Sequence, residues 1–271
     1  MVSFPNCKIN IGLNILSKRE DGYHNLQTIF YPVAIKDIIE IIPSDDKEAV
    51  IYSHSGLDIF GKAENNLCIK AYQLLQQDFP ALPHIRLHLH KTIPMGAGLG
   101  GGSADAAFVL LLLNEQFGLG LSQEQLATYA LRLGSDCPFF IVNKPCFATG
   151  RGEIMEPVEL DLSAYKLAII NPRIHVNTAL TFKQITPGEN DTALSILISQ
   201  PVDTWNQAIV NDFEKPVFLQ HPAIRALKEE LYEQGALYAS MSGSGSTVFG
   251  IFDKNAAPAF NFPGHYFFRW L

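Results

Sequence analysis

Five glycines fall within seven consecutive positions in the stretch PMGAGLGGGSADAA, residues 94–107. Glycine loses more backbone freedom on folding than any other residue, so such a cluster makes sense only where bare backbone is required. The preceding segment IRLHLHK, 85–91, alternates apolar and polar residues and predicts a half-buried strand. The following segment, 103–118, is nearly all apolar and predicts a buried helix. The chain is therefore expected to turn from strand to helix through a glycine loop.

A glycine loop between a strand and a helix is an arrangement that binds phosphate. The first N–H groups of a helix have no partner within it, and the helix dipole favours negative charge at that end. Glycines let successive N–H groups converge on one anion. A plain strand-to-helix turn would need only one or two glycines. The loop has Gly96, Gly98, Gly100, Gly101 and Gly102.

Two better-known phosphate loops match this segment less well. The lysine and hydroxyl residue that complete a Walker loop are absent after Gly101. The dinucleotide fingerprint G-x-G-x-x-G does match at Gly96, Gly98 and Gly101. That fold, however, also requires an acidic residue closing a second strand about 20 residues further on. Here that region reads GLGLSQEQL, which predicts a loop and a helix cap, so a dinucleotide site is disfavoured.

Composition narrows the class of protein. The 271 residues are 47% hydrophobic and 17% charged, which supports one large domain or two ordinary ones. A net charge of -7 gives no basic surface for nucleic acid. The longest apolar run, 106–113, is too short to cross a bilayer, and no signal peptide is evident. We expect a soluble cytoplasmic protein with reduced thiols at Cys7, Cys68, Cys137 and Cys146.

The first half of the sequence predicts strands and helices in alternation. A capping box, Ser122 to Gln125, begins a helix that Gly134 ends. The segment SDCPFFIV, 135–142, is predicted as a tight loop entering a strand. The other predicted elements are strands at 8–16, 26–33 and 37–42, a turn at Asp21-Gly22, and helices at 66–77 and 126–133.

The second half continues the alternation after an irregular segment at 150–161, where we place a domain junction. Strands and helices in both halves favour an α+β protein of two lobes, a two-lobed α/β sandwich. The predicted elements are a strand at 165–172, helices around 178–184, 202–213 and 222–235, and a strand–turn–strand unit across 236–252.

Three motifs together resemble the GHMP kinases, which hold ATP on a glycine loop instead of a Walker loop. The glycine loop resembles motif two, NCKINIGLNI near the N-terminus resembles motif one, and SMSGSGSTVFG at 240–250 resembles motif three. The similarity runs from about residue 5 to 250. DGYH and GSDCPFF resemble the branch of the family that acts on a cytidine diphosphate-linked methylerythritol.

The resemblance implies a GHMP kinase fold with an N-terminal α/β lobe, 1–155, a ferredoxin-like C-terminal lobe, 156–271, and an active site in the cleft between them. It implies ATP-dependent phosphorylation of the substrate's 2-hydroxyl in non-mevalonate isoprenoid synthesis, with Mg²⁺ carried by the nucleotide, by a monomer or homodimer. Two alternatives remain: a GHMP kinase for another small alcohol, such as a sugar, mevalonate or homoserine, and a catalytically silent nucleotide-binding regulator.

The catalytic pair follows from the resemblance. From the residues alone, Asp136 is equally well a turn aspartate, and Lys8 an ordinary solvated lysine. The resemblance makes Asp136 the base for the attacking hydroxyl and Lys8 the cation that holds it ionised. Asn10, on the same strand face as Lys8, would hydrogen-bond the substrate. Retention of both Lys8 and Asp136 argues against the silent regulator.

The nucleotide site is assigned in the same way. Ser103 would contact phosphate or Mg²⁺, or merely cap the helix, and no set of metal ligands is identified. Asp105 would only complement the helix dipole. The role of Gly243 and Gly245 in motif three is left open. The residues implied to hold ATP are Pro94, Met95, Gly96, Ala97, Gly98, Leu99, Gly100, Gly101, Gly102, Ser103 and Ala104, with Asn66, Leu67 and Lys91 beside the adenine.

The cytidine site is expected from Tyr23, His24 and Phe182, with Thr178 as a nearby polar contact. Without the resemblance, DGYH would be a hairpin turn and Phe182 a core residue. Aromatic rings can stack on a pyrimidine, with Phe182 as the opposing wall, and an imidazole can read its hydrogen-bonding edge. A second imidazole motif, His88-x-His90, is predicted to be a solvated strand face and not a metal pair.

Overall fold

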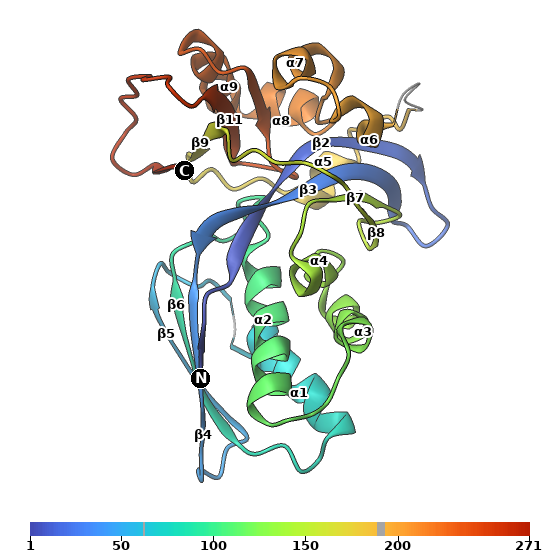
Figure 1. Ribbon diagram of the computed structural model, residues 1–271, viewed down its shortest axis with the longest axis vertical. Helices are drawn as coiled ribbons and strands as arrows, with labels where there is room; N and C mark the ends of the chain where they lie inside the picture. Colours follow the sequence, from blue (N-terminus) through green and yellow to red (C-terminus); the bar gives the residue numbers. More distant parts are fainter. Residues whose placement is uncertain (62, 189–192) are drawn as a thin grey trace. The chain divides into compact units, whose positions relative to one another are not determined.

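The computed structural model describes residues 1–61, 63–188 and 193–271 (Figure 1). They form two compact units that interleave along the chain. The continuous lobes 1–155 and 156–271 stay a prediction from the family resemblance. Unit 1 comprises Met1–Lys8, Pro32–Met95 and Gly100–Lys144, and unit 2 comprises Ile9–Tyr31, Gly96–Leu99 and Pro145–Leu271.

Unit 1 is built on a four-stranded sheet. Strand β6 (Ile85–Lys91) pairs antiparallel with β4 and parallel with β5. Its alternating sequence buries Ile85, Leu87 and Leu89 on one face, as predicted. The prediction missed the edge strand β5. The strand order is β1 (Val2–Ser3), β4 (Ile38–Pro43), β6 and β5 (Val50–Gly56).

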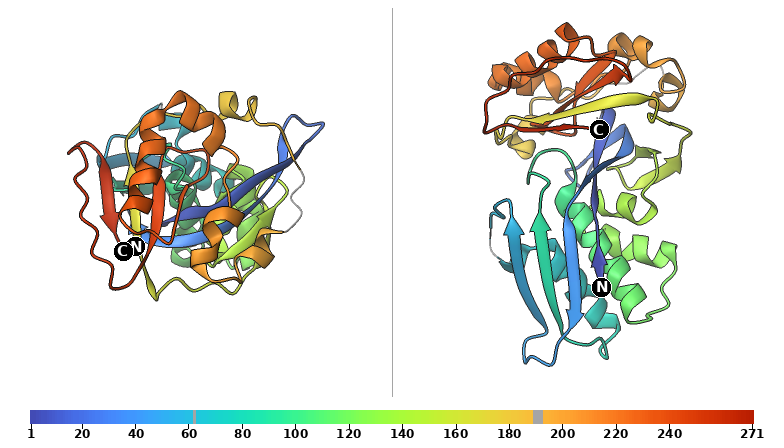
Figure 2. Two further views of the ribbon diagram at one scale, coloured as in Figure 1. Left: turned by 90° about the horizontal axis from the view of Figure 1, so that it is seen from above. Right: turned by 60° about the vertical axis from the view of Figure 1, so that its left-hand side comes forward.

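Helices α1 (Leu67–Asp78) and α2 (Gly101–Gln116) lie together on one face of this sheet (Figure 2). Both were predicted to within a few residues. The apolar run in α2 buries Val109, Leu110 and Leu113, because it lies between the sheet and the other helices. A short 3₁₀ turn, η1 (Ala63–Asn65), precedes α1.

Two further helices complete unit 1. The predicted capping box of α3 (Gln123–Leu133) is present, with the Ser122 hydroxyl accepting from Gln125 N–H and the Gln125 side chain accepting from Ser122 N–H. The prediction of a loop and strand at 135–142 is wrong, because the segment forms α4 (Cys137–Val142). Pro138 supplies a φ suited to the first helical turn, and Asn143 ends the helix with a φ of 54°. The apolar run CPFFIV suggested a strand, but a short helix buries it equally well.

Unit 2 contains most of a second sheet, in which the long strands β2 and β3 were predicted with the turn between them. Gly22 in that turn has a φ of +84°. The segment expected to be irregular at 150–161 contains β8, so that part of the prediction is wrong. Strand β8 pairs with β7, which the prediction also missed. The strand order is β2 (Asn6–Lys18), β3 (His24–Lys36), β7 (Cys146–Thr149) and β8 (Ile154–Pro157).

A third sheet, wholly in unit 2, is antiparallel throughout. Its strands β9, β10 and β11 were predicted, and only the last strand, β12, was not. Gly250 on β11 pairs with Ala168 on β9, which fixes the register. The strand order is β10 (Tyr238–Met241), β11 (Val248–Asp253), β9 (Tyr165–Asn171) and β12 (Phe267–Trp270).

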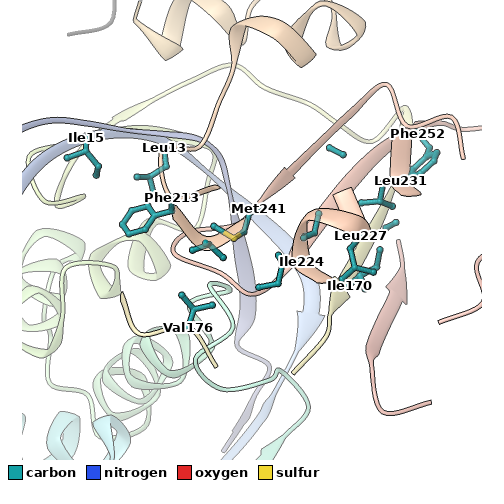
Figure 3. Packing of buried hydrophobic residues seen from close by; sticks show 14 residues of the cluster. Leu13, Ile15, Ile170, Val176, Phe213, Ile224, Leu227, Leu231, Met241 and Phe252 are labelled. Atoms are coloured by element: carbon teal, nitrogen blue, oxygen red, sulfur yellow. The ribbon is translucent and has the colours of Figure 1, made fainter. Parts of the chain in front are cut away.

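Helix α9 (Pro222–Glu233), predicted at 222–235, packs on β10 and β11. Its Ile224, Leu227 and Leu231 join the core of unit 2, as Figure 3 shows. The helix predicted around 202–213 is correct only as far as residue 208, because Ile209 has an extended backbone with φ and ψ of -107° and 109°. The remaining helices are α5 (Thr178–Phe182), α6 (Leu194–Leu197), η2 (Val202–Thr204), α7 (Trp205–Ala208) and α8 (Glu214–Gln220).

Two findings bear on the class of protein. Among the described residues, no helix has the length and apolar character needed to cross a membrane. The thiols of Cys7, Cys68, Cys137 and Cys146 are all free and buried.

Candidate active site

Lys8 and Asp136 form an ion pair within unit 1. The Lys8 Nζ lies 3.4 Å from Asp136 Oδ2, and the two side chains are 4% and 34% exposed. Asp136 occupies the N-cap position of α4, yet its side chain makes no capping hydrogen bond. A partly exposed carboxylate is thus held beside a buried cation, with its oxygens not committed to the helix. Such a group can accept a proton from a bound hydroxyl.

The ion pair adjoins the start of α2, because Lys8 packs against its N-cap residue Gly100. A Cβ added at Gly100 would lie 3.1 Å from Lys8 Cε and 3.0 Å from Phe140 Cζ. No side chain of any size fits there without displacing Lys8. Because residue 100 has no side chain, the Lys8 side chain and the N-terminus of α2 can lie next to each other in unit 1.

The glycine loop has the backbone of an anion-binding nest. The φ angles of Gly96, Gly98 and Gly100 are +61°, +78° and +69°, whereas Ala97 and Leu99 between them keep negative φ. Left-handed glycines at alternate positions allow successive N–H groups to face one anion. The loop continues into α2, whose first turn has no acidic residue in its N-terminal positions to compete for the amides. The backbone fits a polyphosphate.

Motif three supports this loop in unit 2. The Ser242 hydroxyl donates to the Gly98 carbonyl at 2.8 Å, and Thr247 N–H donates to the Ala97 carbonyl at 3.2 Å. A Cβ at Gly98 would collide with the Ser242 carbonyl oxygen. Gly243 is less tightly packed, since a Cβ there would lie 3.3 Å from the Gly98 oxygen. The sequence alone left the role of motif three open. In the structure, motif three holds the carbonyl groups of residues 97 and 98 by hydrogen bonds.

A pocket of about 260 Å³ lies in unit 1 between η1, α1, β5, β6 and the start of α2. The predicted adenine contacts Asn66, Leu67 and Lys91 all line it, with Met95 and Gly102 from the glycine loop. Asn66 also caps α1, since its Oδ1 accepts from Cys68 N–H at 2.8 Å. The pocket has mainly apolar walls and a few polar groups, which suits a flat heterocycle.

Lys91 is held by two carboxylates on the inner side of this pocket. Its Nζ donates to Asp105 Oδ2 at 2.6 Å and also to Asp37 Oδ2. Burial raises the pKa of Asp105 to about 7, against the lowering effect of Lys91. The other oxygen of Asp105, Oδ1, has no hydrogen-bond partner in the described chain. The Lys91 ammonium is therefore committed to the two carboxylates, and its stem forms the pocket wall.

The residues predicted to bind cytidine lie in unit 2. His24 stacks on Phe182 with ring centroids 4.8 Å apart and an angle of 15°. No base fits between these two rings, so Phe182 supports the imidazole instead of facing it across a ligand. Tyr23 is 57% exposed, and the Arg151 guanidinium lies 4.8 Å from its ring centroid. Partial burial lowers the pKa of His24, which keeps the ring neutral.

Two polar residues predicted to contact substrate belong to networks of unit 2. Asn10 is buried, with Nδ2 donating to Thr28 Oγ1 at 2.9 Å and its N–H donating to Ser242 Oγ at 3.1 Å. Thr178 Oγ1 lies 2.7 Å from Ser244 Oγ. Asn10 therefore contacts Ser242 of motif three, and Thr178 contacts Ser244 of the same motif.

Comparison with known proteins gives the family. Residues 66–144 match the profile of the GHMP kinases N terminal domain, and residues 195–260 match the GHMP kinases C terminal profile. A 4-diphosphocytidyl-2-C-methyl-D-erythritol kinase of Bacteroides fragilis is 54% identical over 93% of this chain and 92% of its own. One of Azobacteroides pseudotrichonymphae is 50% identical over 98% and 100%.

The chain belongs to the GHMP kinase family. A crystal structure of 4-(cytidine 5'-diphospho)-2C-methyl-D-erythritol kinase superposes with a TM-score of 0.78 at 30% identity, covering 93% of this chain and 90% of that one. The Methanococcus jannaschii mevalonate kinase shares the fold, with a TM-score of 0.71 at 13% identity over 94% and 92% of the two chains. The predicted GHMP kinase fold is therefore confirmed.

The sequence analysis missed several residues of this GHMP kinase site. Tyr52 and His54 line the pocket from β5, a strand that was not predicted. Asp105 was read only as a partner of the helix dipole, although it lies in the pocket wall. His88 and His90 bond to serines of β5, His88 to both Ser53 and Ser55 and His90 to Ser55.

Proposed function

We propose that this protein transfers the γ-phosphoryl group of ATP to the 2-hydroxyl of 4-diphosphocytidyl-2-C-methyl-D-erythritol, giving the 2-phosphate and ADP. The observation that carries the proposal is the Lys8–Asp136 pair packed against the N-terminus of α2. The relatives at 50–54% identity bear the name of this kinase and match over nearly the whole chain. Their route, the non-mevalonate synthesis of isoprenoids, is proposed for this protein as well.

The chemistry assigned to the pair is proton removal. As the 2-hydroxyl oxygen forms its bond to the γ-phosphorus, its proton passes to the Asp136 carboxylate. The bond from the γ-phosphorus to the β–γ bridging oxygen breaks, and ADP leaves with the electron pair. The Lys8 ammonium, 3.4 Å from Asp136 Oδ2, places a positive charge beside this carboxylate. Because the transition state of phosphoryl transfer is loose, positioning and charge stabilisation account for most of the rate.

ATP fits the described residues at two places. We assign the phosphates to two stretches of bare main chain, Gly96–Leu99 and the open amides at the start of α2, where a Cβ at Gly98 or Gly100 would crowd its neighbours. The pocket beside Asn66 and Leu67 takes the adenine. Mg²⁺ bound to the nucleotide would neutralise part of the phosphate charge. Ser103, in the first turn of α2, is the hydroxyl placed to meet the phosphates or this ion.

The cytidine end of the substrate is assigned to Tyr23 and His24. Tyr23 presents an exposed ring on which a pyrimidine can stack. His24 is kept neutral by its lowered pKa, so its ring has one donor and one acceptor for the edge of cytosine. Phe182 holds the imidazole by stacking on it. These contacts distinguish a cytidylylated alcohol from a plain sugar, mevalonate or homoserine.

An ADP-release assay with four acceptors tests the proposal. The purified protein is given MgATP and either 4-diphosphocytidyl-2-C-methyl-D-erythritol, galactose, mevalonate or homoserine. We expect turnover with the cytidylylated alcohol alone. Turnover with only one of the other three would contradict the substrate, and release with none of them would contradict the kinase activity.

We place the protein in the cytoplasm, because four free thiols suit a reducing compartment. A monomer or homodimer stays a prediction.

A further inference from the structure

The segment Asn211-Asp-Phe-Glu214 ends at the first residue of α8. No function was predicted for it from the sequence, and it takes no part in the proposed chemistry. Asn211 is 3% exposed and Glu214 is 8% exposed. Burying polar side chains is unfavourable unless their hydrogen bonds are satisfied. Two such residues three positions apart indicate a task for which apolar residues would not serve.

Asn211 uses both its amide nitrogen and its amide oxygen, and the nitrogen binds the main chain of motif three. Its Nδ2 donates to the Met241 carbonyl at 2.7 Å and to the Gly243 carbonyl at 2.8 Å. Its Oδ1 accepts from Phe213 N–H at 2.9 Å. Only a side-chain amide offers two donors and an acceptor in one plane, so neither a carboxylate nor a hydroxyl reproduces the set.

Glu214 holds the same strand end from the other side. Its Oε1 accepts from Met241 N–H at 2.8 Å and from Ser240 Oγ at 3.1 Å, and Lys228 Nζ lies 2.6 Å from Oε2. The carboxylate is thus paired and fully used. Asn211 and Glu214 together fix both the carbonyl and the N–H of Met241, directly before the motif-three turn.

The motif-three turn in turn fixes the glycine loop. Ser242 Oγ and Thr247 N–H hold the carbonyls of Gly98 and Ala97. A trans peptide is planar, with its C=O and N–H pointing in opposite directions. Holding these two carbonyls therefore points the N–H groups of Leu99 and Gly98 away from motif three, toward the concave side of the nest. All of these residues belong to unit 2.

We infer that Asn211 is a positioning residue for polyphosphate binding, acting through the 241–247 turn on the amides of residues 98 and 99. This inference rests on the proposed use of ATP. It assigns no contact between Asn211 and the nucleotide. The pocket for the base lies in unit 1, and none of its lining residues takes part in the contacts that run from Asn211 to the glycine loop. We therefore expect Asn211 to affect binding of the phosphates and not of the base.

The test compares two ligands by calorimetry, MgATP and adenosine. Asn211→Asp keeps the shape but replaces two donors with an acceptor that faces two carbonyls. We expect its affinity for MgATP to fall on the order of tenfold, since two hydrogen bonds are lost. Adenosine affinity should stay within twofold of wild type. In turnover assays, the KM for ATP should rise while the KM for the alcohol stays the same.

A second variant keeps the test decisive if Asn211→Asp does not fold. Ser242→Ala removes the hydroxyl that binds the Gly98 carbonyl and should give the same selective loss of MgATP affinity. The matched control is Asn114→Asp in α2, where an asparagine also bonds loop main chain, at Leu121. The control should lower Tm without changing the ratio of MgATP to adenosine affinity.

The outcomes separate the inference from the proposed function. Equal losses for MgATP and adenosine, or no loss for MgATP in either variant, would overturn the role of Asn211. Wild-type protein that binds no MgATP would instead overturn the proposed kinase function.

Discussion

At the scale of single residues, the candidate site depends on charged groups whose burial differs. Lys8 is nearly inaccessible while Asp136 is one-third exposed, so the carboxylate can meet a substrate that the ammonium cannot reach freely. Asp105 lies at the opposite extreme. It is buried, one of its oxygens has no hydrogen-bond partner among the residues that the structure describes, and its lysine also pairs with Asp37. The first aspartate is suited to chemistry and the second to holding structure.

Asp136→Asn should lower kcat by about 10²- to 10⁴-fold, because an amide cannot take the proton of the attacking hydroxyl. The KM for ATP should change little, since Asp136 lies outside the glycine loop. Steady-state kinetics with both substrates varied measure the two effects. The control is Asp46→Asn, an exposed carboxylate bonded to Arg86 at 2.8 Å, which should keep wild-type kcat. A kcat for Asp136→Asn within threefold of wild type would refute its role as base.

Asp105→Asn should remove a pH dependence of stability. Burial raises the pKa of Asp105 from 3.8 to about 7, so the folded protein binds more protons between these values than the unfolded chain. The stabilising contribution is complete below 3.8 and is lost as the pH rises through about 7. Thermal unfolding from pH 4.5 to 8 should show that the wild type loses more stability than the variant as pH rises.

The control for this pH profile is Asp161→Asn. Hydrogen bonds from Ser163 N–H and its hydroxyl lower the pKa of the exposed Asp161. Its contribution therefore has the opposite sign, being present above 3.8 and lost as the pH falls. Parallel wild-type and Asp105→Asn profiles across this range would show that Asp105 is ionised throughout.

At the scale of elements, residues 97 and 98 of the glycine loop are hydrogen-bonded to the motif-three turn within unit 2. Gly96, Gly98 and Gly100 have left-handed φ angles, and the turn holds the carbonyls of Gly98 and Ala97 through Ser242 and Thr247. Neither element contains a charged side chain at these contacts. The positions of the loop's amide groups are therefore fixed by hydrogen bonds to main-chain carbonyls and by the absence of Cβ atoms.

Gly98→Ala should impair both folding and nucleotide use. Alanine at a φ of +78° is strained by about 1–2 kcal/mol, and its Cβ would also collide with the Ser242 carbonyl. We expect kcat/KM for ATP to fall roughly 10²-fold, because displacement of the loop by about an ångström misplaces the phosphates. Gly235→Ala is the matched control, with a φ of +92° but open space around the added Cβ. Gly235→Ala should cause similar backbone strain yet leave kcat/KM for ATP unchanged. An equal loss of kcat/KM in both variants would show that the collision with Ser242 is not the cause.

At the scale of the whole molecule, each unit has its own apolar core. In unit 1 the sheet of β1, β4, β6 and β5 is covered by α1 and α2. In unit 2, residues of β2, β9, β10, β11, α8 and α9 form one cluster that includes Phe213, Met241 and Phe252 (Figure 3). The four cysteines are buried in these interiors.

The thiols should therefore report global unfolding. Burial raises the pKa of Cys7, Cys137 and Cys146 to about 12 and also raises that of Cys68. Because the thiolate is the reactive form, native protein at pH 8 should react with Ellman's reagent very slowly. In 6 M guanidinium all four thiols should react at once. Fast reaction of one thiol in native protein would indicate a local opening at that cysteine.

Much of the fold follows from local patterns that tertiary structure does not alter. The alternation in β6, the apolar stripe of α1 and the capping box of α3 all occur where predicted, because each depends on residues a few positions apart. Segment 137–142 was predicted wrongly because a six-residue apolar run suits a buried helix and a buried strand equally. Strands β8 and β12 were missed because four residues are too few for a clear pattern, and β5 was missed because its sequence VIYSHSG buries no face and so does not alternate.

By itself, the sequence determined the family, the glycine loop and the identities of Lys8 and Asp136 as candidate catalytic residues. Motifs and periodicity are local, so they can be read from the order of residues. Only the tertiary structure decided that Lys8 packs on Gly100, that Lys91 is taken by two aspartates, and that Asn211 holds motif three. These contacts join residues far apart in the chain, and their partners depend on which surfaces the folding of each unit brings together.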